Sequence, residues 1–269
     1  MTSLKPLIKW SGGKYDEYKN YNQYIPTDFK VYIEPFAGGL GNMFNMYNNK
    51  LLTGKQIIIN DMHTELINFY NQLKVNKFND IYNFMKTNKN DETVYYNVRD
   101  NLELTDDIIK ACRFYYLRKT CFRGMIRYNK DGHFNIPFGK YKTCNFEMLK
   151  DKRYYELFKS MLIYNGDFED VLKKYDNKDA FVYLDPPYDS TFKNYGFSNF
   201  GEDEHKRLFN WFKNAKCKVL LIIGKTEFIE NLYKDYIKGR YDKKYKFRLK
   251  EGRIKADDID NEHLIITNY

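Results

Sequence analysis

A short apolar run that ends in a carboxylate and two prolines constrains the fold of this chain more than any other stretch. Residues 180–184 are aliphatic or aromatic throughout, which is typical of a buried strand, and they lead directly into Asp185-Pro186-Pro187-Tyr188. Open α/β sheets bind their ligands at the carboxyl ends of their strands. We therefore expect Asp185 to lie at the ligand-binding edge of a sheet.

The tetrapeptide gathers hydrogen-bond acceptors beside an aromatic ring. Its prolines fix the backbone and remove two N–H donors, so that carbonyl oxygens remain beside the carboxylate. Asp185 and the carbonyl of Pro186 can each accept one N–H of an exocyclic amine, while Tyr188 covers the face of the heterocycle. Adenine is the candidate. The alternative, that Asp185 caps a turn and the prolines merely end the strand, stays open on the tetrapeptide alone.

A second stretch has the pattern of a nucleotide-cofactor element. Residues 31–34 predict a strand, 35–41 form a glycine-rich loop, and 42–47 can continue as a helix. A further strand over 56–60 ends in Asp61, close to the ~20 residues expected between such a loop and a ribose-binding acid. Asp61 as the N-cap of the next helix is the alternative.

In the N-terminal stretch a ligand could approach the backbone closely, beside an aromatic ring and a cation. Trp10 is followed by Gly12-Gly13 and Lys14, a combination that suits a carboxylate ligand. A simple turn is the alternative interpretation.

The middle of the chain changes from helical periodicity to a mixed loop. Helical patterns cover 63–73 and 78–119, whereas 121–142 combine cations, amides, aromatics and the hairpin turn Asp131-Gly132. Arg and Asn side chains can read base edges, and Lys can meet phosphates. We interpret this segment as a nucleic-acid-reading hairpin, the alternative being a solvated hairpin over a helical insert.

The C-terminal part predicts the remaining strands and helices of the sheet. After a strand over 161–164, Asp167 could accept the amine of a cofactor adenine while Phe168 packs on its ring, or Asp167 could cap a helix. Residues 189–201 have the composition of a mobile active-site loop. The further expectations are helices over 202–212 and 227–236, a strand over 218–223, and a closing hairpin with arms at 245–249 and 263–267, with Arg248, Lys250, Arg253 and Lys255 between or near the arms.

The net charge and the spacing of the cysteines indicate which partners and which compartment suit this protein. The 269 residues contain 45 Lys and Arg against 36 Asp and Glu, and 18% aromatics, which favours a polyanionic partner that can stack on rings. The cysteines form no C-x-x-C pair and have no histidine at metal-ligand spacing, so we expect free thiols, no metal and a reducing compartment. No apolar stretch predicts a signal peptide or a membrane span, so we expect a soluble, intracellular protein.

Taken in order, these motifs resemble the Dam-like DNA adenine-N6 methyltransferases that carry an N-terminal cofactor segment. The resemblance covers nearly the whole chain. Lys9 to Lys14 resemble the cofactor segment, Glu34 to Gly39 the glycine loop, Asp61 the ribose-binding acid, Arg127 to Lys140 the target-recognition hairpin, and Asp185 to Tyr188 the catalytic tetrapeptide. The chain departs from the family pattern at two places. Many relatives keep a glycine where this chain has Leu40, and relatives often carry smaller or amide residues where it has Arg123-Gly124.

The resemblance implies a fold, a reaction and a set of site residues. It implies a Rossmann-like α/β sheet with helices on both faces, formed by 1–73 and 158–269, and an inserted target-recognition domain over 74–157. It implies methyl transfer from S-adenosyl-L-methionine, without a metal, to an adenine flipped out of double-stranded DNA into a pocket closed by Tyr188 and Phe36 or Phe192. GATC as the target and a cognate restriction endonuclease as a partner stay open. The expected catalytic residues are Asp185, Pro186, Pro187 and Tyr188; the cofactor residues are Trp10, Lys14, Phe36, Gly38, Gly39, Asp61, Asp167, Phe168 and Asp185; the DNA residues are Arg123, Arg127, Asn129, Asn135 and Lys140.

Three other classes of function compete with this one. A cytosine-N4, RNA or protein-amide methyltransferase could use a related tetrapeptide, although these more often present Ser or Asn in place of Asp185. A nicotinamide oxidoreductase could also contain the glycine loop and Asp61, but that function would not explain the Pro-Pro-Tyr cluster or the basic hairpin. A non-catalytic DNA-binding module is the third.

Overall fold

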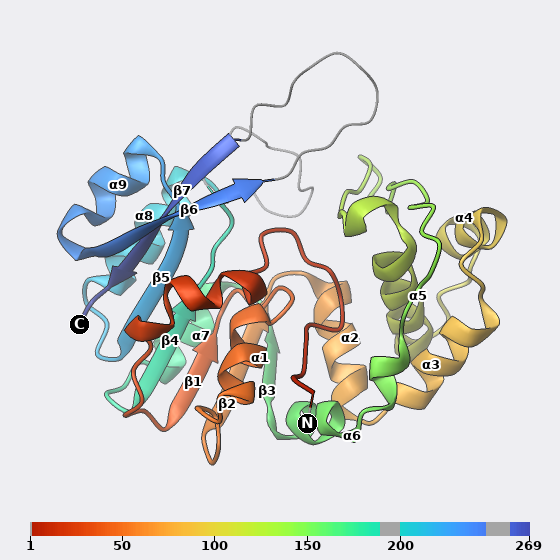
Figure 1. Cartoon of the computed structure of the whole chain (residues 1–269), viewed down its shortest axis with the longest axis horizontal. Coiled ribbons are helices and arrows are strands. Elements are labelled where there is room, and N and C mark those ends of the chain that lie inside the picture. Colours follow the sequence, from red (N-terminus) through yellow and green to blue (C-terminus); the bar gives the residue numbers. More distant parts are fainter. Residues whose placement is uncertain (1, 189–199, 246–258) are drawn as a thin grey trace.

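A mixed sheet forms the centre of the protein. The structure, a computed structural model, describes residues 2–188, 200–245 and 259–269, and within them seven strands pair in the order β3-β2-β1-β4-β5-β7-β6 (Figure 1). Strands β1 to β5 run parallel, whereas β7 is antiparallel to both β5 and β6. The strands are β1 (Val31–Glu34), β2 (Gln56–Asp61), β3 (Leu162–Asn165), β4 (Ala180–Leu184), β5 (Lys218–Gly224), β6 (Ile237–Tyr245) and β7 (Ile259–Thr267).

The predicted parallel strands are confirmed, because their apolar runs match a sheet that is covered on both faces. Every residue of β4 is buried, as are the five central residues of β5. Such burial requires a continuous apolar run rather than an alternating one.

The closing hairpin is longer than predicted. Its first arm, expected at 245–249, begins at Ile237, and residues 246–249 lie outside the described part of the chain, as do the four basic residues expected between or near the arms, Arg248, Lys250, Arg253 and Lys255. The arm was placed too late because residues 237–245 are rich in charges. Lysines and charged side chains are common on the edge strand of a sheet, where they discourage pairing with other chains. A register shift between Ile237 and Gly239 further breaks the strand pattern.

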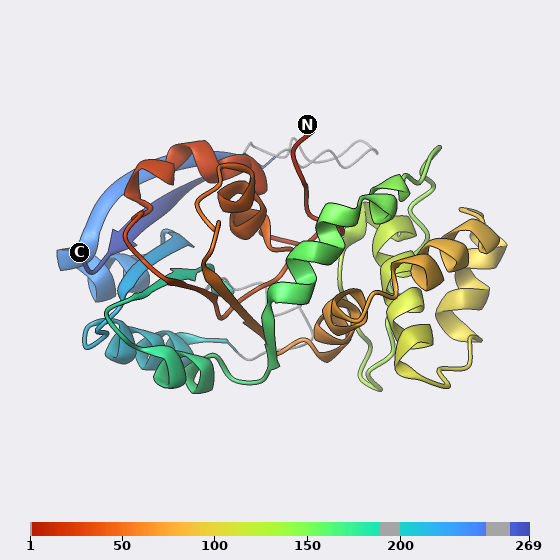
Figure 2. The same ribbon diagram turned by 90° about the horizontal axis from the view of Figure 1, so that it is seen from below.

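Helices cover both faces of the sheet (Figure 2), and each face has its own hydrophobic core. Alternate strand residues divide between these cores: Tyr32 and Phe181 pack into one, Ile33 and Val182 into the other. The first core is covered by the 3-10 helix η1 (Tyr15–Asn20), α1 (Gly41–Asn48), α2 (Thr64–Lys74) and α6 (Lys152–Ser160); the second by α7 (Phe168–Tyr175), α8 (Glu202–Phe212) and α9 (Glu227–Tyr233). None of the helices in the described residues combines the length and apolarity that crossing a bilayer would need.

A helical insert separates α2 from α6. It consists of α3 (Phe78–Thr87), α4 (Glu92–Asp100) and α5 (Asp107–Thr120), as the helical pattern over 78–119 predicted, and Figure 1 shows it beside the sheet. The loop after α5 folds back on itself, with bridges between Cys121 and Phe138 and between Tyr128 and Phe134. The predicted domain boundary at 157/158 falls within the continuous helix α6.

Aspartates set the starts of several helices. Asp106 accepts a hydrogen bond from Ile109 N at 2.9 Å, and Asp151 accepts one from Arg153 N at 3.1 Å. Each satisfies a backbone donor that the first helical turn leaves without an intrahelical partner.

Leu40 adopts a left-handed backbone, with φ 58°, and its side chain is buried. Replacing it by glycine relieves about 1 to 2 kcal/mol of backbone strain but removes a core side chain worth about 3 kcal/mol or more. We therefore expect Leu40→Gly to lower the free energy of unfolding by about 2 kcal/mol, measured by urea denaturation. The matched control is Lys50→Gly at φ 61°, where the side chain is exposed and the same change should stabilise by roughly 0.5 kcal/mol. A Leu40→Gly variant as stable as the parent would mean that strain outweighs packing.

Candidate active site

The order of the strands brings three sequence-distant loops to one edge of the sheet. Strand β1 lies between β2 and β4, and all three run parallel, so the segments that follow them emerge side by side at their carboxyl ends. The direction of connection reverses at this point, between β1 and β4, which is where α/β sheets bind ligands. The glycine loop, Asp61 and Asp185 all lie there.

A buried lysine joins the N-terminal segment to the tetrapeptide. The Lys14 ammonium donates hydrogen bonds to Asp185 Oδ1 at 2.7 Å, to the Tyr188 hydroxyl oxygen at 2.6 Å and to the carbonyl of Gly12 at 2.8 Å. Its side chain is 1% exposed, against 19% for Asp185. The sequence predicted each of these residues in the site, but not that Lys14 contacts the tetrapeptide.

Burial and the charge of Lys14 shift the pKa of Asp185 in opposite directions. Burial raises the pKa of Asp185, and the adjoining Lys14 ammonium opposes that rise. The paired ammonium therefore stabilises the ionised form of a carboxylate that burial alone would favour as neutral. An ionised carboxylate is an acceptor only, which suits the binding of an amine.

The glycine loop packs directly against Trp10. Gly38 has φ +44°, and a Cβ at this position would lie 2.7 Å from Trp10 Cδ1, so the approach requires glycine. The Gly38 N–H donates to Asp61 Oδ2 at 2.9 Å, and the Tyr70 hydroxyl donates to the Gly38 carbonyl. At Gly39, an added Cβ would be 3.0 Å from the Cβ of Trp10. The structure thus brings together four of the residues predicted for the cofactor: Trp10, Gly38, Gly39 and Asp61.

Asp61 is not the cap of the following helix, so that alternative is wrong. The N-cap of α2 is His63, whose Nδ1 accepts a hydrogen bond from Leu66 N at 3.2 Å. Asp61 Oδ1 instead accepts from His63 N at 2.9 Å. Burial raises the pKa of Asp61, and its hydrogen bonds from the Gly38 and His63 backbones oppose the rise.

Asp167 and Phe168 lie at the start of α7, where the capping alternative is observed. Asp167 accepts from Glu169 N at 2.9 Å and from Arg207 at 2.7 Å. Phe168 is buried, with its ring centroid 5.3 Å from that of Phe36 and 5.8 Å from that of Phe200. Phe36 and Phe168 therefore form one aromatic cluster below the glycine loop.

Glu34 is a buried acid at the end of β1 for which the sequence predicted no separate role. Its Oε1 accepts from the Tyr32 hydroxyl at 2.6 Å and from Met43 N at 3.2 Å, whereas Oε2 has no hydrogen-bond partner among the described residues. Burial raises the pKa of Glu34 to about 8; the Tyr32 hydrogen bond opposes the rise and the nearby charge of Asp185 adds to it. The clue in the sequence was an acidic residue at the end of an apolar strand.

The predicted recognition hairpin is tied to the cofactor segment by a buried arginine. Arg118, at the end of α5, donates to the carbonyl oxygens of Lys9, Gly124 and Met125, and its guanidinium carbon lies 5.4 Å from the centre of the Trp10 ring. This residue too was missed, since an arginine in a helix is usually a surface side chain.

A second tie runs from the hairpin to α2. The Tyr128 hydroxyl donates to Glu65 and lies 3.3 Å from Nε2 of His63. The hairpin is therefore fixed to the same helix that follows Asp61.

The residues predicted to contact DNA lie on the hairpin, and most are exposed. Arg127 Nε donates to Asn135 Oδ1 at 2.7 Å. The side-chain oxygen of Asn129 accepts from the backbone N–H groups of Asp131 and His133, which closes the turn. Arg123, Arg127, Asn129 and Lys140 are exposed, and Asn135 is half-buried.

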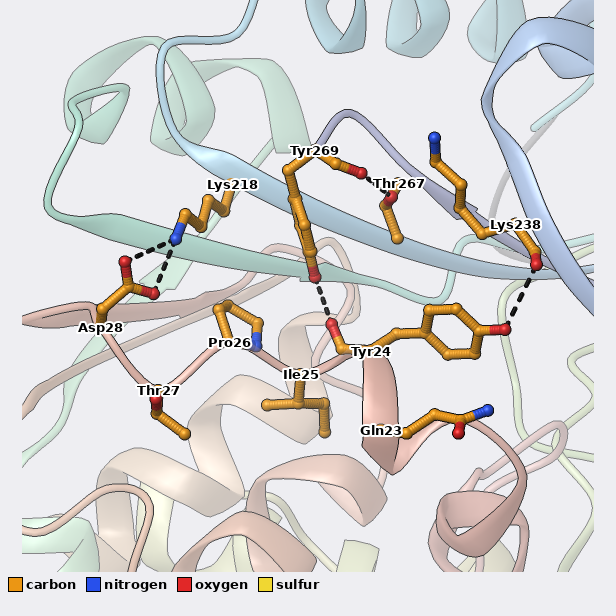
Figure 3. A pocket seen from close by; sticks show the side chains of 10 residues that line it. All are labelled: Gln23, Tyr24, Ile25, Pro26, Thr27, Asp28, Lys218, Lys238, Thr267 and Tyr269. Carbon is orange, nitrogen blue, oxygen red and sulfur yellow. Dashed lines mark hydrogen bonds and ion pairs between the residues drawn. The ribbon is translucent and has the colours of Figure 1, made fainter.

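A surface hollow at the other end of the strands does not belong to this site. Figure 3 shows Lys218, the first residue of β5, paired with Asp28 at 2.6 and 2.7 Å. Tyr269, which also lines the hollow, donates to the carbonyl of Tyr24. These contacts fix the C-terminal strand to the segment before β1.

Comparison with known proteins identifies one family. A family model described as D12 class N6 adenine-specific DNA methyltransferase matches residues 10–249.

Individual relatives agree with the family. The chain is 48% identical to the type II methyltransferase M.CviBI of Paramecium bursaria Chlorella virus NC1A, over 99% of this chain and 100% of that protein. It is 32% identical to the type II methyltransferase M.MjaIII of Methanocaldococcus jannaschii, over 87% and 89%. Identity to a DNA adenine methylase of Haemophilus influenzae is 28%, over 85% and 82%.

The raised pKa of Glu34 makes stability depend on pH. A carboxyl with a raised pKa keeps its proton in the folded protein at pH values where the unfolded chain has lost it, so rising pH favours the unfolded chain between about 4.5 and about 8. We expect the free energy of unfolding of the parent to fall, relative to Glu34→Gln, by about 3 kcal/mol between pH 5 and pH 8, measured by urea denaturation. Glu103→Gln, at an exposed site, is the control and should follow the parent. Parallel profiles for Glu34→Gln and the parent would contradict the assignment.

Proposed function

Because this chain belongs to the D12 class of N6 adenine-specific DNA methyltransferases, we propose that the cluster of Lys14, Asp185 and Tyr188 carries out methyl transfer to adenine. The observation that supports this most directly is the buried ion pair that holds the Asp185 carboxylate at the carboxyl end of β4. Family membership decides against the cytosine-N4, RNA, protein-amide, oxidoreductase and non-catalytic alternatives.

The family implies S-adenosyl-L-methionine as the methyl donor, and the described residues fit such a ligand. The buried Oε2 of Glu34 has no partner among the described residues and, with the raised pKa of this acid, can carry a proton and donate, while the partly buried Asp61 offers an acceptor beside the glycine loop. Asp61 would bind the ribose hydroxyls and Asp185 the cationic part of the donor, while Lys14, whose three N–H donors are taken by Gly12, Asp185 and Tyr188, would bind the carboxylate only by exchanging one of them. Gly38 and Gly39 would permit a close approach beside Trp10, and the cluster of Phe36 and Phe168, with Asp167 beside it, would meet the adenine of the cofactor.

The reaction requires activation of a weak nucleophile. The lone pair of adenine N6 is delocalised into the ring, and S-adenosyl-L-methionine supplies, when bound, an electrophilic methyl group on a sulfonium sulfur. Asp185 and the Pro186 carbonyl would each accept one N6 hydrogen, which favours a pyramidal nitrogen and stabilises the positive charge that develops on it. Lys14 favours the ionised form of the carboxylate and fixes its direction. Pro187 would hold the backbone between these acceptors and Tyr188.

The target base must leave the duplex to reach this site. Extrusion of one nucleotide costs a few kcal/mol, which stacking in a pocket offsets. Tyr188 would cover the ring face, together with Phe36 or with Phe192, which lies outside the described residues. In-line placement of N6 against the methyl group then supplies much of the rate.

The hairpin after α5 would read double-stranded DNA. We propose residues 74–157 as the target-recognition domain and 1–73 with 158–269 as the catalytic domain. Arg127, Asn129 and Asn135 would contact base edges, while Arg123 and Lys140 would contact phosphates or bases. Sequencing of methylated bases in DNA from cells that express the protein will identify the target, for which the resemblance suggests GATC, and a companion endonuclease would be tested on the same site.

Asp185→Ala should abolish methyl transfer, with a loss of at least about 10²-fold in kcat, because it removes the charged acceptor. The measurement is incorporation of labelled methyl groups into DNA, with circular dichroism to establish that the variant is folded. Asp179→Ala is the control: Asp179 precedes the opposite end of β4, where it pairs with exposed Lys30. Near-normal incorporation by Asp185→Ala would refute the assignment.

Arg127→Ala should loosen target choice more than it weakens cofactor binding. Loss of a base contact costs about 1–3 kcal/mol of discrimination, or roughly 5- to 150-fold between cognate duplexes and duplexes with one altered base pair. Lys140→Ala removes the same charge and should instead weaken methylation evenly across duplexes. Unchanged discrimination in Arg127→Ala would count against a reading role.

A further inference from the structure

The ring of Tyr188, the last residue of the tetrapeptide, packs against strands β5 and β7. Its hydroxyl lies 3.4 Å from Nε2 of His263 on β7, and the two rings are 5.5 Å apart at 71°. A Cβ on Gly224, which pairs with His263 across β5 and β7, would touch the Tyr188 ring at 3.5 Å. His263 is fully buried and lies beyond residues 10–249, the part of the chain that the family model matches.

The other nitrogen of the same imidazole faces a buried acid. Nδ1 of His263 lies 2.9 Å from Glu17 Oε2 and 3.0 Å from the Tyr241 hydroxyl, which itself donates to Glu17 at 2.7 Å. Lys243 also donates to Glu17. Burial alone would raise the pKa of Glu17, but the hydrogen bonds from His263 and Lys243 and the charge of Lys14 lower it to about 2. Glu17 is therefore a carboxylate that can only accept.

These contacts define a direction for the protons. An ionised Glu17 favours a proton on Nδ1 of His263, and in the neutral imidazole with that tautomer Nε2 carries a lone pair. The oxygen of Tyr188 accepts from Lys14, and because the same hydroxyl lies 3.4 Å from Nε2 it can donate to the lone pair of this tautomer. The order of donation is then Lys14 to Tyr188, Tyr188 to His263, and His263 to Glu17.

We propose that Glu17 and His263 are positioning residues for methyl transfer: they fix the imidazole tautomer that accepts the Tyr188 hydroxyl, and so hold the Tyr188 ring and Lys14 in place beside Asp185. The inference rests on the proposed role of Tyr188 as a wall of the base pocket. Three elements that are distant in the sequence, η1, β7 and the loop after β4, are joined through the contacts of His263 with Glu17 and Tyr188. A histidine that merely filled the core would need no acceptor aimed at the tetrapeptide.

Two substitutions at position 263 separate this role from general packing. In His263→Asn the amide can still donate to Glu17 but is too short to reach Tyr188, whereas in His263→Gln the amide oxygen can take the place of Nε2. Both variants lose the imidazole. We expect His263→Asn to lower kcat roughly tenfold, the worth of one buried hydrogen bond, with little change in the KM for S-adenosyl-L-methionine, and His263→Gln to recover most of that loss.

The kcat values of His263→Asn and His263→Gln are then measured in a Tyr188→Phe background, which lacks the hydroxyl. If His263 acts through that group, the difference between the Asn and Gln variants disappears in this background. A difference that persists, or Asn and Gln variants with equal kcat in the parent background, would overturn the proposal and leave His263 with a structural role.

A readout independent of activity uses the full chain with ¹⁵N-labelled histidine. Nuclear magnetic resonance should show His263 with its proton on Nδ1 in the parent, a shift of the Nε2 resonance in Tyr188→Phe, and loss of the single tautomer in Glu17→Gln. A proton on Nε2 in the parent would overturn the proposal even if the position 263 variants fail to fold. If the parent transfers no methyl group to adenine, the proposed function fails instead, and the tautomer measurement still decides the hydrogen-bond chain.

Discussion

The buried ion pair between Lys14 and Asp185 is the interaction on which the site depends. Removing two charges from water costs several kcal/mol per ion, and attraction offsets that cost only where the geometry is good and the remaining donors are satisfied. Both conditions hold, since the pair is 2.7 Å long and the ammonium also donates to Gly12 and Tyr188. The pair fixes an N-terminal segment against the end of β4, 171 positions further along the chain.

Several acids near Lys14 differ in the direction in which the protein shifts their pKa. Glu34 has a raised pKa because it is buried with few partners, whereas Glu17 has a lowered pKa because His263 and Lys243 donate to it. Both share the neighbourhood of Asp185. The ionised Glu17 and the Lys14-paired Asp185 suit a cationic methyl donor and an amine substrate, whereas burial favours Glu34 as a neutral acid.

Local pattern predicted the strands, the glycine loop, the tetrapeptide and the helical insert, because each of these is encoded by a few consecutive residues. The first arm of the terminal hairpin was misplaced, since the charges of an edge strand hide its period. The tie between hairpin and cofactor segment was also missed. It depends on Arg118, a helical arginine whose burial follows from packing rather than from its neighbours in the sequence.

By itself the sequence determined the class of chemistry, because a carboxylate, two prolines and a tyrosine after an apolar strand limit what the strand end can bind. Only the tertiary structure decided which side chains meet. The pairing of Lys14 with Asp185 and the contacts of His263 with Glu17 and Tyr188 join residues that no local spacing relates. Partners of this kind are selected by the order and register of the strands, and that order is set by the packing of the whole sheet rather than by any single segment.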